Sequence, residues 1–289
     1  MRRTIARTAA GAVLIGVWLV AGCSSLRGGQ AVRFDNLTPG APLTIDATLV
    51  LPSGPGPFPA VVQFHGCGGL EAQSFRWARW FADHGYAALV VDSFGARHVK
   101  GDCRTGPDEP PVTARFDDAF GALRYLQSRP DVRADRVGAI GWSQGGVYAM
   151  AVINGPSLER ARRRGVALPA VGFAASVGVY PGGCFSLVKE QVVRPLLVLI
   201  GEADDWTPAA TCREMVAAMR SRGADATIVT YPGAYHYFDV EGQPHEVLSQ
   251  VENDNRAGGF GATVSYQAEA AADAHRRIDE FLARHLRGP

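Results

Sequence analysis

Gly141-Trp142-Ser143-Gln144-Gly145 lies between an apolar run expected to be a strand, Val137–Ile140, and a segment expected to be a helix, Gly145–Ile153. Its form is Gly-x-Ser-x-Gly. A serine on so sharp a turn takes strained backbone angles, and the flanking residues must be small for strand and helix to approach each other. The pattern therefore predicts a serine hydroxyl raised above a sheet at the N-terminus of a helix, where developing negative charge is favoured.

Short apolar runs and longer helical patterns alternate along the rest of the chain. Strands are expected at Leu43–Leu51, Ala60–Phe64, Ala87–Val91, Val171–Val179, Leu196–Ile200 and Ala226–Tyr231, and helices at Glu71–His84, around Phe116–Leu126, at Ala209–Arg220 and at Tyr266–Leu286. This alternation indicates right-handed crossovers and a mostly parallel sheet covered on both faces. We expect one doubly wound α/β domain over residues 31–289, with a surface excursion at Asn154–Pro169 and a loop at Gln243–Gly261.

Composition excludes several classes of protein. The 289 residues are 47% hydrophobic and 20% charged, which excludes intrinsic disorder, collagen and coiled coil. The formal net charge is +1, and no run of Lys and Arg is interleaved with aromatic residues. We therefore expect no nucleic-acid partner.

The first 22 residues have the pattern of an export signal. Arg2, Arg3 and Arg7 precede an apolar stretch, Ala9–Ala21, that is short for a membrane span. Leu19-Val20-Ala21-Gly22-Cys23 resembles the lipobox of bacterial lipoproteins, which implies removal of residues 1–22 and lipidation of Cys23. Residues 23–30 would then be a tether, and attachment to the periplasmic face of the outer membrane is expected. A retained anchor or an ordinary signal is the alternative.

A nucleophilic serine needs a base and an acid that orients the base. In doubly wound hydrolases these follow the serine in the order acid, then histidine. Asp204 is the first choice for the acid and Asp205 the second, because both come directly after the strand Leu196–Ile200. His236 follows the last expected strand and is the predicted base. The other histidines either precede Ser143 or lie farther along the chain.

Acyl transfer also needs N–H donors for an oxyanion. The backbone of Gln144, directly after Ser143, supplies one. The second is expected from the loop His65-Gly66-Cys67-Gly68-Gly69, with Cys67 preferred and Gly66 as the alternative. This loop lacks the glycine patterns of nucleotide-binding sites, and we expect neither an organic cofactor nor a metal.

Five segments together resemble the dienelactone hydrolase family of α/β-hydrolases. They are His65–Leu70, Asp92–Phe94, Gly141–Gly146, Gly201–Pro208 and Tyr231–His236. The resemblance implies the α/β-hydrolase fold and favours Asp204 over Asp205 as the acid. The namesake enzymes carry a cysteine nucleophile where this chain has Ser143, so general carboxylic esters are expected rather than dienoic lactones alone.

Four cysteines remain besides Cys23, and an even number in an exported protein predicts disulfides. The four are Cys67, Cys103, Cys184 and Cys212, and no two have the close spacing of a zinc site. The residues alone leave three pairings open. The usual strand order of the resembled family implies the pairs Cys67–Cys103 and Cys184–Cys212.

The expected activity is an exported serine hydrolase that cleaves small-molecule esters or lactones. Trp142, Phe94 and Trp206 flank the expected site and indicate an apolar acyl pocket, although aromatic residues there also serve packing. Arg97 either holds a substrate carboxylate or forms a surface ion pair. The alternatives are a serine peptidase or thioesterase, and a non-catalytic envelope lipoprotein that binds a ligand.

Overall fold

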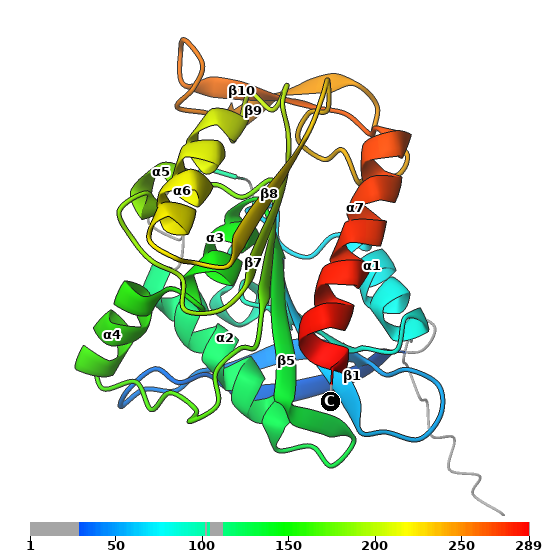
Figure 1. The fold of residues 1–289 in the computed structure, drawn as a ribbon, viewed down its shortest axis with the longest axis vertical. Helices are drawn as coiled ribbons and strands as arrows, with labels where there is room; N and C mark the ends of the chain where they lie inside the picture. Colours follow the sequence, from blue (N-terminus) through cyan, green and yellow to red (C-terminus); the bar gives the residue numbers. More distant parts are fainter. Residues whose placement is uncertain (1–28, 102, 105–111, 289) are drawn as a thin grey trace, which may run out of the picture.

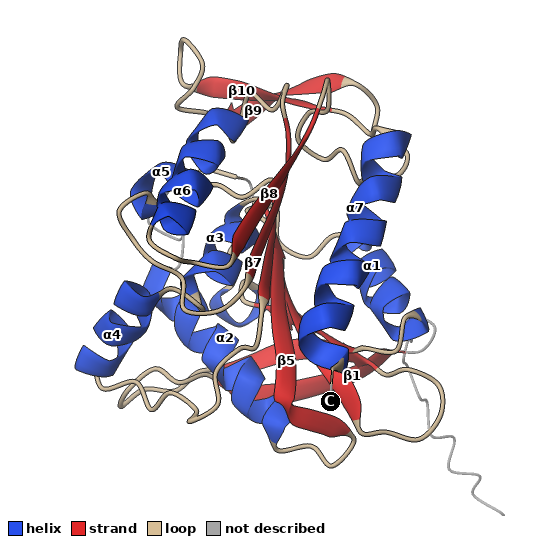
Figure 2. Ribbon diagram, viewed as in Figure 1, coloured by secondary structure: helices blue, strands red, loops and turns tan. Residues whose placement is uncertain are grey.

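An eight-stranded sheet runs through the molecule and carries helices on both faces (Figures 1 and 2). The computed structural model describes residues 29–101, 103–104 and 112–288. The strands are β1 (Gly29–Asp35), β2 (Thr44–Val50), β3 (Phe58–Phe64), β4 (Ala87–Asp92), β5 (Val132–Trp142), β6 (Ser176–Val179), β7 (Leu196–Gly201) and β8 (Ala226–Tyr231). Their order in the sheet is β1-β2-β4-β3-β5-β6-β7-β8, so the doubly wound arrangement is confirmed.

The helices are α1 (Ala72–Asp83), α2 (Val112–Gln127), α3 (Gln144–Ala151), α4 (Gly155–Arg163), α5 (Cys184–Leu187), α6 (Ala209–Ser221) and α7 (Ala268–Leu282), which continues into a π-helical turn at Ala283–Arg287. A short 3₁₀ turn lies at Gly95–Arg97. Helices α1 and α7 cover one face of the sheet, and α2, α3 and α6 cover the other (Figure 2).

Six strands, β3 to β8, pair in parallel, whereas β1 and β2 are antiparallel additions at one edge. The central strands are apolar throughout because helices cover both of their faces, and every residue of β7 is buried. The carboxyl ends of the parallel strands all meet one edge of the sheet. Ligand sites of open α/β sheets form at this edge.

The chain segments expected to be irregular contain regular structure. The expected surface excursion includes α4, whose N-cap is Asn154; the Asn154 Oδ1 accepts the N–H of Ser157 at 2.9 Å. The expected loop Gln243–Gly261 contains most of an antiparallel hairpin, β9 (Glu246–Glu252) and β10 (Phe260–Val264). The prediction of a loop was wrong because β9 is largely exposed and its apolar residues, Val247, Leu248 and Val251, do not alternate with polar ones as in a typical strand.

Strand β1 begins at Gly29, inside the segment expected to be a tether. Cys23 and the rest of residues 1–28 lie outside the described residues. Within the described part of the chain, no helix has the length and apolar character needed to cross a membrane.

Both expected disulfides are present in the structure, Cys67–Cys103 and Cys184–Cys212. Cys67 follows β3 and Cys103 follows β4, and these two strands are neighbours. Cys184 follows β6, and Cys212 lies on α6, after the neighbouring strand β7. The strand order therefore brings each pair together at the carboxyl edge of the sheet.

Replacing Cys184 and Cys212 together by Ala should lower the free energy of unfolding by about 2–4 kcal/mol, because the bridge closes a loop of 28 residues in the unfolded chain. Urea unfolding of the variant and the unaltered protein measures this difference. Alkylation of the unaltered, non-reduced protein should label none of the four cysteines, and four labelled thiols would contradict both pairs.

Candidate active site

Ser143 sits on a strained turn between β5 and α3, with φ 54° and ψ −119°. A Cβ atom on Gly141 would lie 2.0 Å from the carbonyl oxygen of Gly145, and one on Gly145 would lie 2.1 Å from that of Phe64. No side chain fits at either distance, so both glycines are required by the close approach of helix and sheet. The N–H of Ser143 donates to the carbonyl of Val179 at the end of β6, at 3.0 Å.

His236 and Asp204 form a buried pair on the loops after β8 and β7. The Nδ1 of His236 lies 2.8 Å from Oδ2 of Asp204, and both side chains are fully buried. The carboxylate also accepts the N–H groups of Trp206 and Thr207, at 3.0 and 2.8 Å, and the Thr207 hydroxyl, at 2.9 Å. With so many donors around it Asp204 is held as a fixed acceptor, so Nδ1 of His236 carries the proton and Nε2 is left as a base.

Ser143 and His236 lie at the same edge of the sheet without a hydrogen bond between their side chains. Among the described residues, Nε2 of His236 has no hydrogen-bond partner. Tyr180, which follows Val179, packs its ring against the imidazole with the centroids 4.4 Å apart. Catalytic hydrogen bonds are often formed only when substrate is bound, so a missing bond in the free protein does not argue against a serine–histidine pair.

The loop after β3 lies against the serine. A Cβ atom on Gly66 would be 3.6 Å from Cβ of Ser143. Gln144 is the first residue of α3, and the first N–H groups of a helix have no partner within the helix. The two residues expected to donate to an oxyanion, Cys67 and Gln144, both line one pocket.

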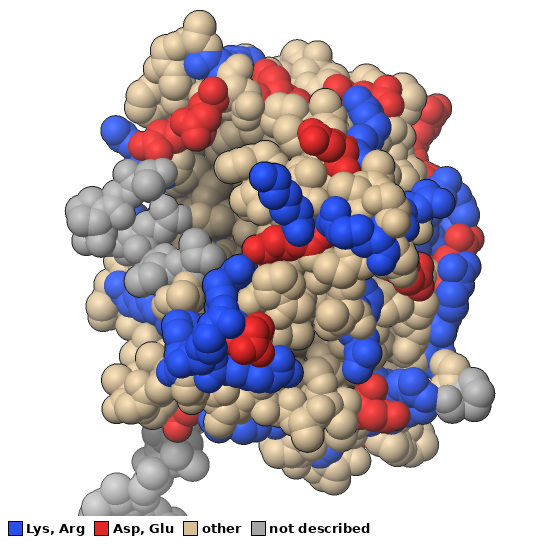
Figure 3. All heavy atoms as spheres, turned by 60° about the vertical axis from the view of Figure 1, so that its left-hand side comes forward, with Lys and Arg blue, Asp and Glu red and all other residues tan. Residues whose placement is uncertain are grey.

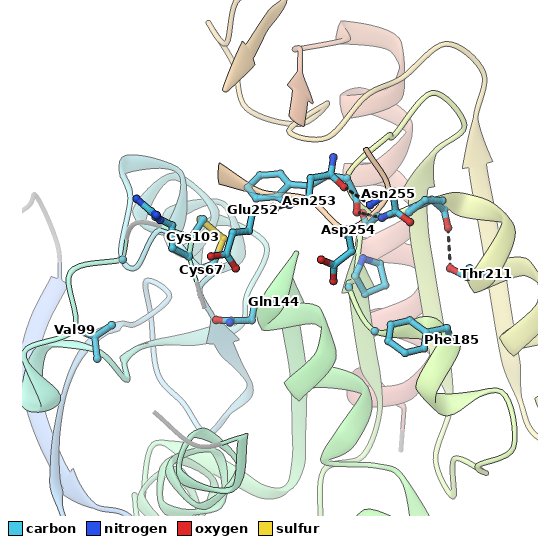
Figure 4. A pocket seen from close by; sticks show the side chains of 18 of the residues that line it. Cys67, Val99, Cys103, Gln144, Phe185, Thr211, Glu252, Asn253, Asp254 and Asn255 are labelled. Carbon is cyan, nitrogen blue, oxygen red and sulfur yellow. Dashed lines mark hydrogen bonds between the residues drawn. A yellow bond between two sulfur atoms is a disulfide. The ribbon is translucent and has the colours of Figure 1, made fainter. Parts of the chain in front are cut away.

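This pocket has a volume of about 530 Å³ and opens at the surface as a hollow with acidic side chains along part of its rim (Figure 3). Phe94 and Trp206 line it, as expected. Figure 4 shows the carboxylates of Glu252 and Asp254 above Gln144 in that view; they come from the end of β9 and the turn after it. The walls are thus mixed in polarity, with aromatic rings and charged groups.

Ser143 itself lines a second, much smaller cavity of about 20 Å³, together with His65, Glu71 and Tyr237. Burial raises the pKa of Glu71, although Tyr237 donates its hydroxyl to Oε1 at 3.5 Å. Burial, helped by the charge of Arg115, holds the pKa of His65 well below its usual range. His65 is therefore neutral near pH 7.

Two expected substrate contacts are made differently in the structure. Arg97 forms a two-pronged ion pair with the buried Asp118, at 2.8 Å for each bond, and donates to the carbonyl of Ser93 at 2.6 Å. It is not among the described residues that line the pocket. Of the two interpretations of Arg97, the structure therefore favours the ion pair over a contact with a substrate carboxylate, and the pair is largely buried because Asp118 is a buried partner.

Trp142 is buried and lines only the small cavity beside Ser143. Its indole N–H donates to Oδ2 of Asp239 at 2.9 Å, and the indole of Trp77 donates to the same oxygen at 2.9 Å. Gln73 Nε2 also donates to Asp239, at 2.7 Å, as does the hydroxyl of Tyr180, at 2.7 Å. The expected contribution of Trp142 to an acyl pocket is replaced by this packing role.

Asp239 was missed by the sequence analysis, although it connects α1, β5, the residue that follows β6 and the loop that carries His236. Its carboxylate is buried and accepts from four side chains on three segments that are far apart in the sequence. A position three residues after His236 was the only available hint, and it specifies no contact. Such a cluster is visible only once the strands are ordered in the sheet.

Asp205, the second choice for the acid, binds the β9–β10 hairpin instead. Its carboxylate accepts the N–H and the hydroxyl of Thr263, at 2.8 and 2.7 Å, and pairs with Arg256. Asn253 donates its side-chain amide to the backbone carbonyl of Asp205 at 3.0 Å. The two adjacent carboxylates thus have different roles. Asp204 orients His236, and Asp205 binds the β9–β10 hairpin, whose residues line part of the pocket.

The parallel sheet, the strained serine after a central strand and the later aspartate and histidine have the arrangement of an α/β-hydrolase fold. Residues 45–286 match the family model described as the dienelactone hydrolase family. The chain therefore belongs to the dienelactone hydrolase family, and this membership supports a hydrolytic enzyme.

Curated relatives include thioesterases and a lactonase. The chain is 26% identical over 279 residues to the mouse (Mus musculus) peroxisomal succinyl-coenzyme A thioesterase, covering 84% of this chain and 63% of the relative. It is 25% identical over 209 residues to a probable 2-oxo-3-(5-oxofuran-2-ylidene)propanoate lactonase from Bradyrhizobium sp, covering 66% of this chain and 78% of the relative. The chain thus spans somewhat less than two thirds of the length of the thioesterase.

Solved structures share the fold. A putative dienelactone hydrolase from Klebsiella pneumoniae superposes with a TM-score of 0.62 at 22% identity, covering 88% of this chain and 99% of that one. Esterase 2 from Thermogutta terrifontis, phosphorylated by paraoxon, gives a TM-score of 0.62 at 19% identity, covering 89% and 94%. At these identities the likeness establishes the fold alone.

Replacing Asp205 by Asn should loosen the hairpin at neutral pH, because the amide cannot accept from both Thr263 and Arg256. Burial alone would raise the pKa of Asp205, but hydrogen bonds from Thr263 and Arg256 outweigh it and lower the pKa. This stabilisation is present at neutral pH and is lost as pH falls through the lowered pKa of Asp205, below the ordinary range of an aspartate.

Amide hydrogen exchange measures the effect, and we expect faster exchange in β9 and β10 with little change in the central sheet. Asp254→Asn, in the turn between β9 and β10, is the matched control. Equal exchange in the Asp205 variant and the unaltered protein would contradict the assigned role.

Proposed function

We propose that this chain is an exported serine hydrolase that cleaves carboxylic esters or lactones through an acyl-enzyme, with Ser143 as nucleophile, His236 as base and Asp204 as the residue that orients the base. The observation that carries the proposal is the buried Asp204–His236 pair, which fixes the proton on Nδ1 and leaves Nε2 unpartnered among the described residues. Ser143 stands on its strained turn at the same sheet edge.

In the first half of the reaction Nε2 of His236 removes the hydroxyl proton of Ser143 while the oxygen attacks the substrate carbonyl. The imidazolium that forms is stabilised by the Asp204 carboxylate. The N–H groups of Gln144 and Cys67 receive the oxyanion, and His236 then returns the proton to the leaving alcohol. In the second half water replaces the alcohol and Ser143 is released.

The pocket of about 530 Å³ is lined by Gln144 and Trp206, whereas Ser143 lines the smaller cavity. The size of the larger pocket suits a small-molecule substrate that would reach Ser143 past Gln144. Thioesters are the second candidate, because relatives that align with 84% of this chain are named a succinyl-coenzyme A thioesterase and an acyl-coenzyme A thioesterase. The same acyl-transfer machinery serves both bonds.

Replacing Ser143 by Ala should abolish turnover of short acyl esters, because the proposed nucleophilic oxygen is lost. The folded protein should stay intact, because the substitution removes only one hydroxyl group. Asp204→Asn should lower kcat by about 10³–10⁴-fold, since the imidazole loses its fixed tautomer. Steady-state kinetics with p-nitrophenyl esters and near-UV circular dichroism measure both properties. Ser221→Ala, on the last turn of α6, is the control.

Labelling with a fluorophosphonate probe separates an enzyme from a ligand-binding protein. Mass spectrometry should find the probe on Ser143 in the unaltered chain. Labelling at another residue, or full activity of Ser143→Ala, would reject the assignment. Parallel assays with matched esters and acyl-coenzyme A thioesters of equal acyl length compare kcat/KM, and a ratio favouring thioesters by tenfold or more would select the second candidate.

We propose further that the chain is an exported lipoprotein anchored through Cys23. Two disulfides support this location, because disulfides persist in oxidising compartments. In a bacterial host, Cys23→Ala should move the protein from the membrane fraction to the soluble fraction without changing its esterase activity. Metabolic labelling with a fatty-acid analogue should mark the unaltered protein only, and equal labelling of the variant would refute the anchor.

A further inference from the structure

Arg115, on the first turns of α2, contacts both segments that carry the expected oxyanion donors, which are the loop after β3 and the start of α3. It is a buried arginine, only 2% exposed. Its Nη1 donates to the side-chain Oε1 of Gln144 at 2.5 Å, and its Nη2 donates to the carbonyl oxygen of His65 at 2.7 Å. One rigid guanidinium therefore bridges the start of α3 and the loop after β3.

Aromatic rings fix the orientation of this guanidinium. Its central carbon lies 4.4 Å from the ring centroid of Tyr148 on α3 and 5.0 Å from that of Phe94, which follows β4. Stacking on aromatic faces suits the planar guanidinium and adds a favourable cation–π term. The two hydrogen-bonding directions of Arg115 are thus set by packing as well as by their acceptors.

Arg115 thus binds the two segments that carry the expected oxyanion donors. The distance between those donors matters because both must reach the same oxygen. Gln144 supplies one N–H of the expected pair, and Cys67 is two residues beyond His65. The Nδ1–H of His65 donates to the carbonyl of Gly66 at 2.7 Å. This bond restrains the short backbone segment from His65, which accepts from Arg115, to Cys67. Donors to a developing oxyanion act through fixed placement, so a small change in their separation reduces their effect.

We propose that Arg115 is a positioning residue that holds the two oxyanion donors at their working separation. The inference rests on the proposed function, because it assigns Arg115 a part in the same site. Arg115 acts through Gln144 and the His65–Cys67 loop. Its charge already acts on this loop, because together with burial it holds the pKa of His65 low.

The test compares Arg115→Met and Arg115→Lys with the unaltered protein. Loss of the bridge should lower kcat for a p-nitrophenyl ester by about 10–100-fold while KM changes less than about twofold, since the donors act on the transition state. Affinity for a boronic acid that mimics the tetrahedral intermediate should fall by a similar factor. Arg115→Lys keeps the positive charge but lacks the planar guanidinium that bonds to two acceptors at once, so it should retain only part of the activity.

A double-mutant cycle ties the effect to Gln144. Gln144→Ala removes Oε1 and keeps the backbone N–H, so it should share part of the loss, and combining it with Arg115→Met should cost less than the sum of the single effects. Arg164→Met is the matched control, because the guanidinium of Arg164 also donates two hydrogen bonds to a group on α2, the carboxylate of Asp117, at 2.8 and 3.2 Å. This control is expected to lower thermal stability and leave kcat unchanged.

The outcomes are distinguishable. If the unaltered protein neither turns over esters or thioesters nor reacts with the fluorophosphonate probe, the proposed function fails. If it is active but Arg115→Met keeps its kcat, or if Arg115→Met and Arg164→Met lose kcat equally, Arg115 is a structural residue only and the inference is overturned. If Arg115→Met does not fold, the kcat, KM and boronic-acid affinity of Arg115→Lys, alone and with Gln144→Ala, decide in the same way.

Discussion

The close approach of β5 and α3 is the constraint on which the rest of the site depends. Because Gly145 packs directly on the end of β3 and Gly141 on Gly145, the residue between them is forced into a left-handed conformation that few side chains adopt. This strain is sustained by the sheet and the helix on either side. It lifts Ser143 to the edge where the loops after β3, β6, β7 and β8 meet.

Buried polar groups then fix those loops. Asp204 holds His236, Asp239 joins α1 and β5 to the His236 loop, and Arg115 joins α3 to the loop after β3. Each is a charged side chain satisfied by several hydrogen bonds, since an unsatisfied buried charge would be costly. The site is thus held by polar contacts within an apolar fold, and the disulfide Cys67–Cys103 adds a covalent tie at the same edge.

The sequence predicted the elements with strong patterns and missed those whose stability comes from contacts. The apolar strands and α1, with its Gly85 stop, follow from periodicity and turn chemistry. The β9–β10 hairpin does not, because β9 is largely exposed without regular alternation and the hairpin is held by contacts with Asp205, Cys103 and Trp206. Arg97 was ambiguous for a similar reason, since its partner Asp118 lies 21 residues away on α2.

By itself the sequence determined the fold class, the strained serine, the histidine and a choice between two adjacent carboxylates, because turns and apolar runs are local features. Only the tertiary structure decided which carboxylate faces the imidazole and which binds the hairpin. It also brought Arg115 and Asp239 to the site. These assignments depend on which strands are neighbours and on the direction each side chain takes from its loop, and neither is encoded in local spacing.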